Sequence, residues 1–233
     1  RRSGRSDRLF VREMEWEAAE TVMLWADRSA AMELRSESAP RTKAERAAVL
    51  ALAVGVLLAR GDERFGLAGT EAETPASGRT QLMRMAALLS ADMPDPPPYG
   101  VPPRIALPRI GHAVFISDFL GDEEAILASV RDAAGRGLGG VLLQVLDPEE
   151  EAFPYRGRLR FEGAGGGLAH ETDEAGSLRR AYLARLAARR DRLDAVARRA
   201  GWRFIRHTTG ESPRVALLAL YNALGGGGPG GRV

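Results

Sequence analysis

The chain has 233 residues, of which 45% are hydrophobic and 27% charged, a balance typical of a globular protein with one large or two small domains. It contains no cysteine, which excludes disulfides, thiolate metal sites and cysteine nucleophiles. The formal net charge is only +2 and acids interrupt the basic runs, so the charge pattern does not favour nucleic-acid binding.

The spacing of apolar residues predicts strands that alternate with helices along the chain. An exposed strand is expected first, over Leu9–Glu17, followed by a short buried strand over Thr21–Ala26. The later expected strands cover residues 64–68, 113–116, 141–146, 158–162 and 203–206. The expected helices, bounded by polar or glycine caps, cover residues 43–60, 80–91, 122–136, 177–200 and 213–224.

Two segments break this alternation. Seven prolines between residues 94 and 108 exclude regular structure and predict a surface loop. From residue 225 the chain is rich in glycine, and we expect a disordered tail over 225–233. Residues 1–19 are then expected to form an N-terminal strand segment that packs on a main domain over 20–224.

The order of elements predicts an α/β fold with a doubly wound, mostly parallel, Rossmann-like sheet flanked by helices, with an extra N-terminal strand. In such sheets ligands bind at the carboxyl ends of the strands, where the winding direction reverses. The loops that follow Ala26 and Ile116, and the loop before Thr80, are therefore the candidates for a binding site.

Four oxygen-bearing side chains are expected at these loops. Asp27 and Ser29 follow the first buried strand, Thr80 opens a helix, and Asp118 follows the strand over 113–116. Hard cations such as Mg²⁺ or Mn²⁺ take oxygen ligands with a few carboxylates, so the set is adequate for a metal site. An aspartate after a strand also caps nearby backbone amides, and the residue pattern alone favours that role.

Three stretches resemble the von Willebrand factor type A fold with its metal-ion-dependent adhesion site: "LWADRSAAM", "SGRTQLMRMAALL" and "VFISDF". That site has the pattern Asp-x-Ser-x-Ser, then a threonine at a helix start, then an aspartate after a later strand. Three further stretches resemble the bacterial domain of unknown function 58 family, which contains such a domain: "RSDRLFVREMEWE", "KAERAAVLALAVGVLL" and "HTTGESPRVALLAL".

The resemblance implies a non-enzymatic protein-interaction module that works with a MoxR-type AAA+ ATPase in the assembly or maturation of other proteins. It also implies that Asp27, Ser29, Thr80 and Asp118 are the ligands of Mg²⁺ or Mn²⁺, which holds an acidic residue of the partner in related domains. Ala31 stands where the pattern has a serine, so we expect a degenerate site with weak or absent metal binding.

Two other functions stay open at this point. A metal-dependent hydrolase would use Asp27 and Asp118, although the sequence places no convincing base or nucleophile beside them. An anion-binding regulatory domain would use the arginine-rich helix over 177–200, whose arginines otherwise form a solvated outer face.

The location of the protein is inferred from what the sequence lacks. The longest apolar run, over 47–59, is too short to span a bilayer, and no signal peptide is visible. We therefore expect a cytoplasmic protein with no membrane span in this chain.

Overall fold

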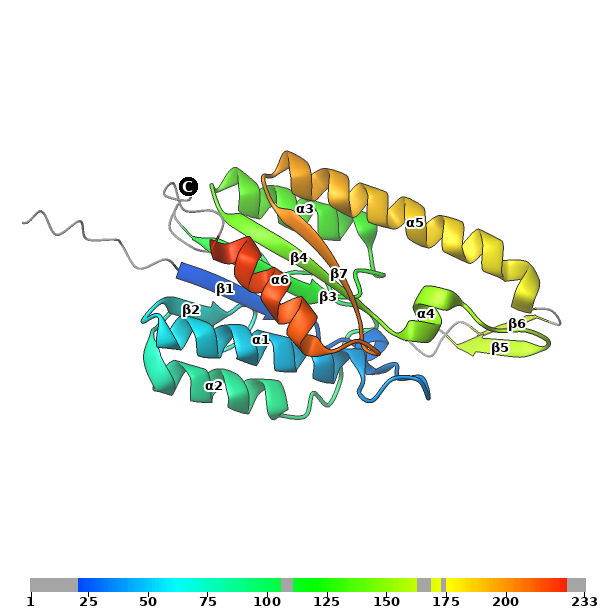
Figure 1. The fold of residues 1–233 in the computed structure, drawn as a ribbon, viewed down its shortest axis with the longest axis horizontal. Helices are drawn as coiled ribbons and strands as arrows, with labels where there is room; N and C mark the ends of the chain where they lie inside the picture. The colour runs from blue at the N-terminus through cyan, green and yellow to red at the C-terminus, as the bar shows by residue number, and fades with distance from the viewer. Residues whose placement is uncertain (1–20, 106–110, 163–168, 173–174, 226–233) are drawn as a thin grey trace, which may run out of the picture.

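The computed structural model describes residues 21–105, 111–162, 169–172 and 175–225 (Figure 1). The strand expected over Leu9–Glu17 lies outside these residues, as does the expected glycine-rich tail from residue 226 onward. The domain boundaries inferred from the sequence therefore stay predictions.

Five parallel strands form the main sheet in the order β2-β1-β3-β4-β7. Their bounds are Thr21–Ala26 for β1, Arg64–Leu67 for β2, His112–Ser117 for β3, Gly139–Leu146 for β4 and Arg203–Thr208 for β7. The chain adds β2 on one side of β1 and β3 on the other, so the winding reverses between β1 and β3. This confirms the predicted doubly wound α/β fold and places the end of β1 beside the end of β3.

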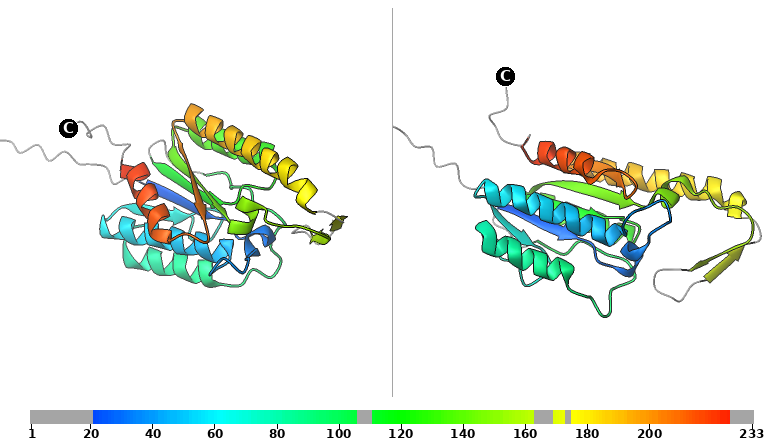
Figure 2. Two further views of the ribbon diagram at one scale, coloured as in Figure 1. Left: turned by 45° about the vertical axis from the view of Figure 1, so that its right-hand side comes forward. Right: turned by 60° about the horizontal axis from the view of Figure 1, so that its bottom comes forward.

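Helices cover both faces of this sheet (Figures 1 and 2). One face carries α1 (Lys43–Arg60), α2 (Gly78–Ser90) and α6 (Pro213–Gly225), and the other carries α3 (Glu123–Gly135) and α5 (Ala175–Arg199). Successive strand residues point to opposite faces, so each strand contributes to two separate apolar cores.

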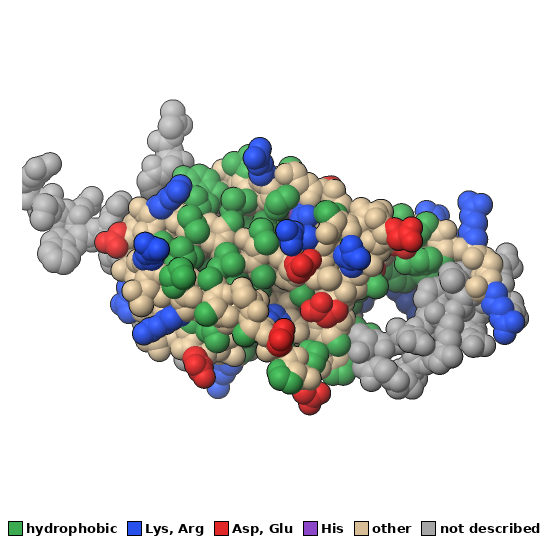
Figure 3. All heavy atoms as spheres, turned by 90° about the horizontal axis from the view of Figure 1, so that it is seen from below, with side chains coloured by type: hydrophobic (Ala, Val, Ile, Leu, Met, Phe, Trp, Pro, Cys, Tyr) green, Lys and Arg blue, Asp and Glu red, His purple; other side chains and the backbone are tan. Residues whose placement is uncertain are grey.

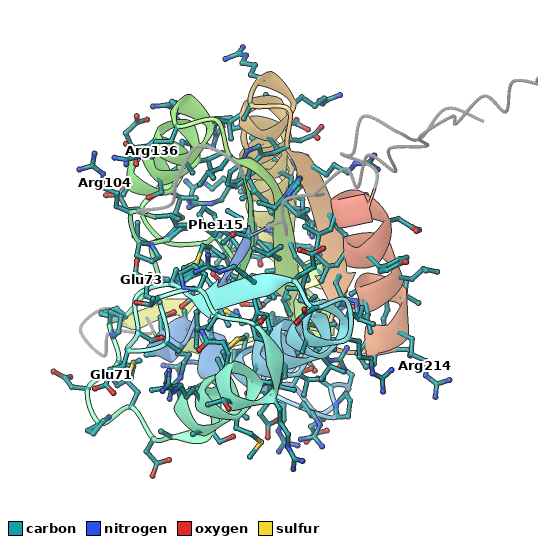
Figure 4. All side chains as sticks on the ribbon, turned by 90° about the vertical axis from the view of Figure 1, so that its left-hand side faces the viewer. Glu71, Glu73, Arg104, Phe115, Arg136 and Arg214 are labelled. Carbon is teal, nitrogen blue, oxygen red and sulfur yellow. The ribbon has the colours of Figure 1, made fainter. Side chains whose placement is uncertain are left out.

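The division between the two cores is visible within β1 and β3. Leu24 and Ile116 belong to the core under α1, whereas Trp25 and Phe115 belong to the core under α3 and α5. Phe115 lies in the interior in Figure 4. On the surface of that layer, Figure 4 also shows Arg104 and Arg136 close together, where both pair with Asp132 of α3.

The bounds of β1 and α1 match the predicted ones because their local signals are strong. In α1, the Thr42 hydroxyl accepts from the amide of Glu45 and the Glu45 carboxylate accepts from the amide of Thr42, which completes a capping box. At the other end the Gly61 amide donates to Leu57, and the helix stops there.

One region was not predicted correctly. A short helix, α4 (Pro148–Ala152), follows β4, and the expected strand over 158–162 is one half of an antiparallel hairpin, β5 (Leu159–Glu162) with β6 (Ala169–Thr172). The helix expected over residues 177–200 begins two residues earlier, since α5 starts at Ala175. The sequence of β6, Ala-His-Glu-Thr, has no apolar alternation, so periodicity could not reveal it.

Apolar side chains also reach the surface, and Figure 3 shows them gathered on the face that carries α1 and α6. On α6 the exposed ones recur along one side of the helix, at Val215, Leu218 and Tyr221. Among the described helices, none combines the length and the apolar character needed to cross a membrane.

Candidate functional site at the carboxyl edge of the sheet

Asp27 lies directly beyond β1, and its amide donates to the Ile116 carbonyl of β3 across the point where the winding reverses (2.9 Å). Its carboxylate is only 1% exposed and accepts hydrogen bonds from the Ser29 amide (2.8 Å) and the Ser117 hydroxyl (2.6 Å). Burial raises the pKa of Asp27, and the hydrogen bonds from Ser117 and Ser29 oppose that rise. Both carboxylate oxygens are therefore already engaged by the protein.

The proline-rich loop covers this carboxylate. The amides of Ala30 and Ala31 donate to the carbonyls of Pro97 (2.9 Å) and Pro98 (3.0 Å), which ties the loop to the segment after Asp27. Gly100 then packs onto the carboxylate so closely that a Cβ atom there would lie 2.2 Å from Asp27 Oδ1. The loop at this point therefore requires glycine for its lack of a side chain.

Asp118 lies beyond β3 and is paired with a buried lysine. Lys43 Nζ donates to Asp118 Oδ2 (2.8 Å) and to Glu150 Oε1 of α4 (2.7 Å), and the lysine is 1% exposed. Burial alone would lower the pKa of Lys43, but the two carboxylates raise it above its ordinary value. The other Asp118 oxygen accepts from the Leu120 amide (2.9 Å), so each oxygen of this carboxylate also has a donor within the chain.

Two arginines of helix α5 donate hydrogen bonds to groups at the same edge of the sheet. Arg190 donates to the Gln144 side chain (2.8 Å), which in turn donates to the Asp118 carbonyl (2.9 Å), and Arg190 also pairs with Glu151. Arg189 donates to the carbonyls of Phe119 and Gly121. The expected solvated outer face is therefore incomplete, because these two arginines hold the loop after β3 and helix α4 in place.

Thr80 does not join Asp27, Ser29 and Asp118. The segment after β2 turns back along that strand, so that Ala76 bridges Phe65 near the start of β2, and α2 begins two residues later. Thr80 is exposed in the first turn of α2, whereas the last residues of that helix contact Arg28. Thirteen helical residues span about 20 Å, so Thr80 lies near the opposite edge of the sheet.

The residues present do not make up the expected set of ligands for a divalent cation. Each carboxylate oxygen of Asp27 and Asp118 already accepts one hydrogen bond, Ala31 supplies no oxygen and Thr80 lies elsewhere. Of the four expected ligands, Ser29 alone has a buried oxygen without a hydrogen-bond partner among the described residues. Within the described part of the chain, no three His, Asp or Glu side chains are grouped as metal ligands. The arrangement instead suits a preformed surface in which Lys43 faces Asp118 and Glu150, and neutral donors hold the Asp27 carboxylate.

Sequence reasoning missed Ser117, Gly100, Glu150 and Lys43. One signal could have revealed the lysine, because Lys43 is the only lysine among 33 basic residues and opens an otherwise apolar helix. Nothing in the local pattern around Glu150 or Gly100 distinguishes either from an ordinary helix-start acid or loop glycine.

Two cavities adjoin at this edge. One, of about 240 Å³, is lined by Asp27, Ser29 and Val101 among others. The second, of about 490 Å³, shares Arg28, Leu89 and Met93 with the first. Two apolar side chains that line these cavities are exposed by about two fifths, Met93 in both and Val101 in the first. Tyr99, in the same proline-rich loop, is exposed to a similar extent. The edge thus presents an apolar rim above two hydrogen-bonded carboxylates, whereas the buried Ser29 hydroxyl has no hydrogen-bond partner among the described residues.

A buried histidine near the end of β7 is expected to make the stability of the fold depend on pH. Arg46 donates to His207 Nε2 (2.6 Å), so that nitrogen must be the acceptor of a neutral ring, while Glu211 lies 3.3 Å from Nδ1. Burial and the Arg46 charge lower the pKa of His207 below its ordinary 6.5. Below about pH 6.5 the unfolded chain binds a proton here that the folded chain does not, so stability falls as the pH falls, by up to about 1.4 kcal/mol per pH unit.

Urea unfolding between about pH 7.5 and 5.5 measures this effect above the range in which ordinary carboxylates titrate. His207→Gln, whose amide oxygen still accepts from Arg46, is expected to show a flatter pH profile. An equal slope in the two proteins would refute the assignment to His207.

Comparison with known proteins agrees with this architecture. The family described as "Protein of unknown function DUF58" matches residues 1–192. An aerotolerance-related membrane protein from Bacteroides fragilis, solved with multiple mutations to serines, is 16% identical, with a TM-score of 0.52 over 89% of this chain and 100% of its own. The conserved hypothetical protein BatB from Bacteroides thetaiotaomicron is 14% identical, with a TM-score of 0.50 over 89% of this chain and 98% of its own.

At these identities the two structures show the fold alone, which is von Willebrand factor type A-like. None of the curated proteins matches the chain.

Proposed function

This chain belongs to the family of proteins of unknown function DUF58, and from that membership and its von Willebrand factor type A-like fold we propose that it is a non-enzymatic protein-interaction module. Its partner binds at the carboxyl edge of the sheet, over the degenerate adhesion site around Asp27. The module acts in the cytoplasm, in the assembly or maturation of other proteins.

One observation carries this proposal, an apolar rim beside two cavities, above carboxylates that are hydrogen-bonded within the chain. Met93 and Val101 line two adjoining cavities and are exposed, as is Tyr99 in the same loop. Covering these apolar side chains with another protein would remove them from water, which favours binding. The carboxylates beneath are buried and engaged, so they shape the surface and are not available to bind a ligand directly.

A hydrolase using Asp27 and Asp118 is less well supported by this geometry. A general base or nucleophile needs a free lone pair within reach of a substrate. Asp27 lies under Gly100 with its oxygens held by Ser29 and Ser117, and Asp118 is held by Lys43.

The partner that best agrees with the family resemblance is a MoxR-type AAA+ ATPase. We expect such an ATPase, purified from the same organism, to bind the full chain when the chain is immobilised and the ATPase is titrated by biolayer interferometry. Met93→Glu places a charge in the apolar rim and is expected to weaken binding by about tenfold or more.

Met83→Glu is the matched control, because Met83 is 57% exposed on α2 and lines neither cavity, whereas Met93 is 41% exposed and lines both. Equal loss of binding in the two variants, or in neither, would contradict an interface at this edge.

Asp27→Asn tests whether the carboxylate charge matters for the interaction. Burial raises the pKa of Asp27, so its charge carries a desolvation penalty that an amide avoids, and Ser117 can reverse its hydroxyl to accept from the new amide group. We expect the free energy of unfolding, measured in urea, to stay within about 1 kcal/mol of wild type, with unchanged partner affinity. Loss of affinity from a stably folded Asp27→Asn chain would show that the charge itself is recognised.

A further inference from the structure

The chain uses arginine for every basic side chain except one. Lys43 is the only lysine among 33 lysine and arginine residues, and it is also one of the most deeply buried side chains. An arginine preference accounts for the other basic positions, so the exception calls for a property that arginine lacks. That property is a compact ammonium charge on a flexible stem, in contrast to the broad planar fork of a guanidinium.

The surroundings of the ammonium group are those of a small cation. Asp118 Oδ2 and Glu150 Oε1 lie 2.8 and 2.7 Å from Nζ and come from separate segments, the loop after β3 and helix α4. Asp27 is a third buried carboxylate near enough to interact electrostatically with Asp118. Two buried carboxylates, Asp27 and Asp118, and the partly exposed carboxylate of Glu150 therefore lie along this edge, and Lys43 supplies the positive charge that Asp118 and Glu150 face.

We infer that Lys43 is the resident cation of this edge, supplying the positive charge that a divalent ion supplies in a metal-dependent adhesion site. Interactions at this edge accordingly need no metal ion. The inference does not depend on the identity of the partner, because it concerns the chain's own charges.

The geometry makes a direct prediction about removal of the lysine. Two carboxylate oxygens already point to one position from less than 3 Å, and Mg²⁺, Mn²⁺ or Ca²⁺ binds carboxylate oxygens at about 2.0–2.6 Å. Lys43→Ala removes the ammonium and most of its stem, which leaves room there for an ion and its waters. The variant is expected to gain a divalent-cation site that the wild-type chain lacks.

The experiment is a titration of the full chain with Mn²⁺, followed by electron paramagnetic resonance of the free ion. Lys43→Ala is expected to bind Mn²⁺ at least about tenfold more tightly than wild type and to show a higher melting temperature in its presence. Adding Asp118→Asn to Lys43→Ala should abolish both effects.

Arg46→Ala is the matched control. Arg46 is a buried basic residue one turn further along α1, but it donates to His207 and to the carbonyls of Thr209 and Glu211, with no carboxylate among those partners. Its removal should create no cation site.

Each arm of the experiment decides the inference. Millimolar Mn²⁺ that fails to bind Lys43→Ala, or binds Arg46→Ala equally well, overturns it. Wild-type binding that Asp118→Asn abolishes overturns it as well. Lys43→Ala could be unfolded in the absence of metal. A cation site would then stabilise the fold by mass action, so Mn²⁺ should restore the circular dichroism spectrum of the folded chain. Failure of Mn²⁺ to restore it would refute the inference.

Discussion

Replacing Lys43 by methionine is expected to lower the free energy of unfolding by about 3–5 kcal/mol, because it leaves the Asp118 and Glu150 carboxylates buried without their shared cation. Methionine fills most of the space of the lysine stem, so the loss measures charge and not a cavity. Burial already raises the pKa of Glu150 against the opposing Lys43 charge, and without that charge the carboxyl group should take up a proton more readily. Urea unfolding near neutral pH gives the magnitude.

The matched comparison removes all three charges together. Lys43→Met combined with Asp118→Asn and Glu150→Gln leaves no uncompensated ion, and is expected to recover most of the lost stability. If the triple variant were as unstable as the single one, packing and not charge balance would explain the role of Lys43.

Gly100→Ala is expected to lower the free energy of unfolding by about 1–3 kcal/mol, because the added methyl group would overlap the Asp27 carboxylate at 2.2 Å. The loop is tied on the other side through the carbonyls of Pro97 and Pro98, so it cannot move away without breaking those hydrogen bonds. Thermal unfolding followed by circular dichroism measures the effect.

Gly135→Ala is the control for this substitution. Gly135 ends α3 with open space where its Cβ would lie, so alanine there should be neutral or stabilising. Combining Gly100→Ala with Asp27→Ala should give less than the sum of the two separate losses, because the clash then has no carboxylate partner. Strict additivity would show that the methyl group clashes with something other than Asp27.

The fold was predictable because its signals are local. Two elements have strong local sequence patterns, the buried strand over Thr21–Ala26 and the capped apolar helix over Lys43–Arg60. Both were predicted with the bounds observed. The placement of Asp27 and Asp118 at the same edge could also be predicted. Each residue follows one of the two strands, β1 and β3, between which the winding reverses.

The composition of the site was less predictable because it depends on contacts between distant segments. Lys43 and Asp118 are 75 residues apart, and Asp27 meets Ser117 across 90 residues. Thr80 lies near the opposite edge of the sheet because the loop after β2 runs back along the strand before the helix starts, a path that no local pattern reveals. The family resemblance indicated the expected metal ligands, but it did not indicate which side chains form hydrogen bonds and ion pairs with them in this chain.

The single lysine has a practical consequence for chemical labelling. Because its ε-amino group is buried between two carboxylates, the native protein offers amine-reactive reagents no readily accessible lysine. Acylation of that amine requires the edge to open, so its rate at fixed reagent concentration reports the frequency of local opening. The rate at which acylated Lys43 appears in the mass spectrum would therefore measure how often the carboxyl edge opens, without an introduced label.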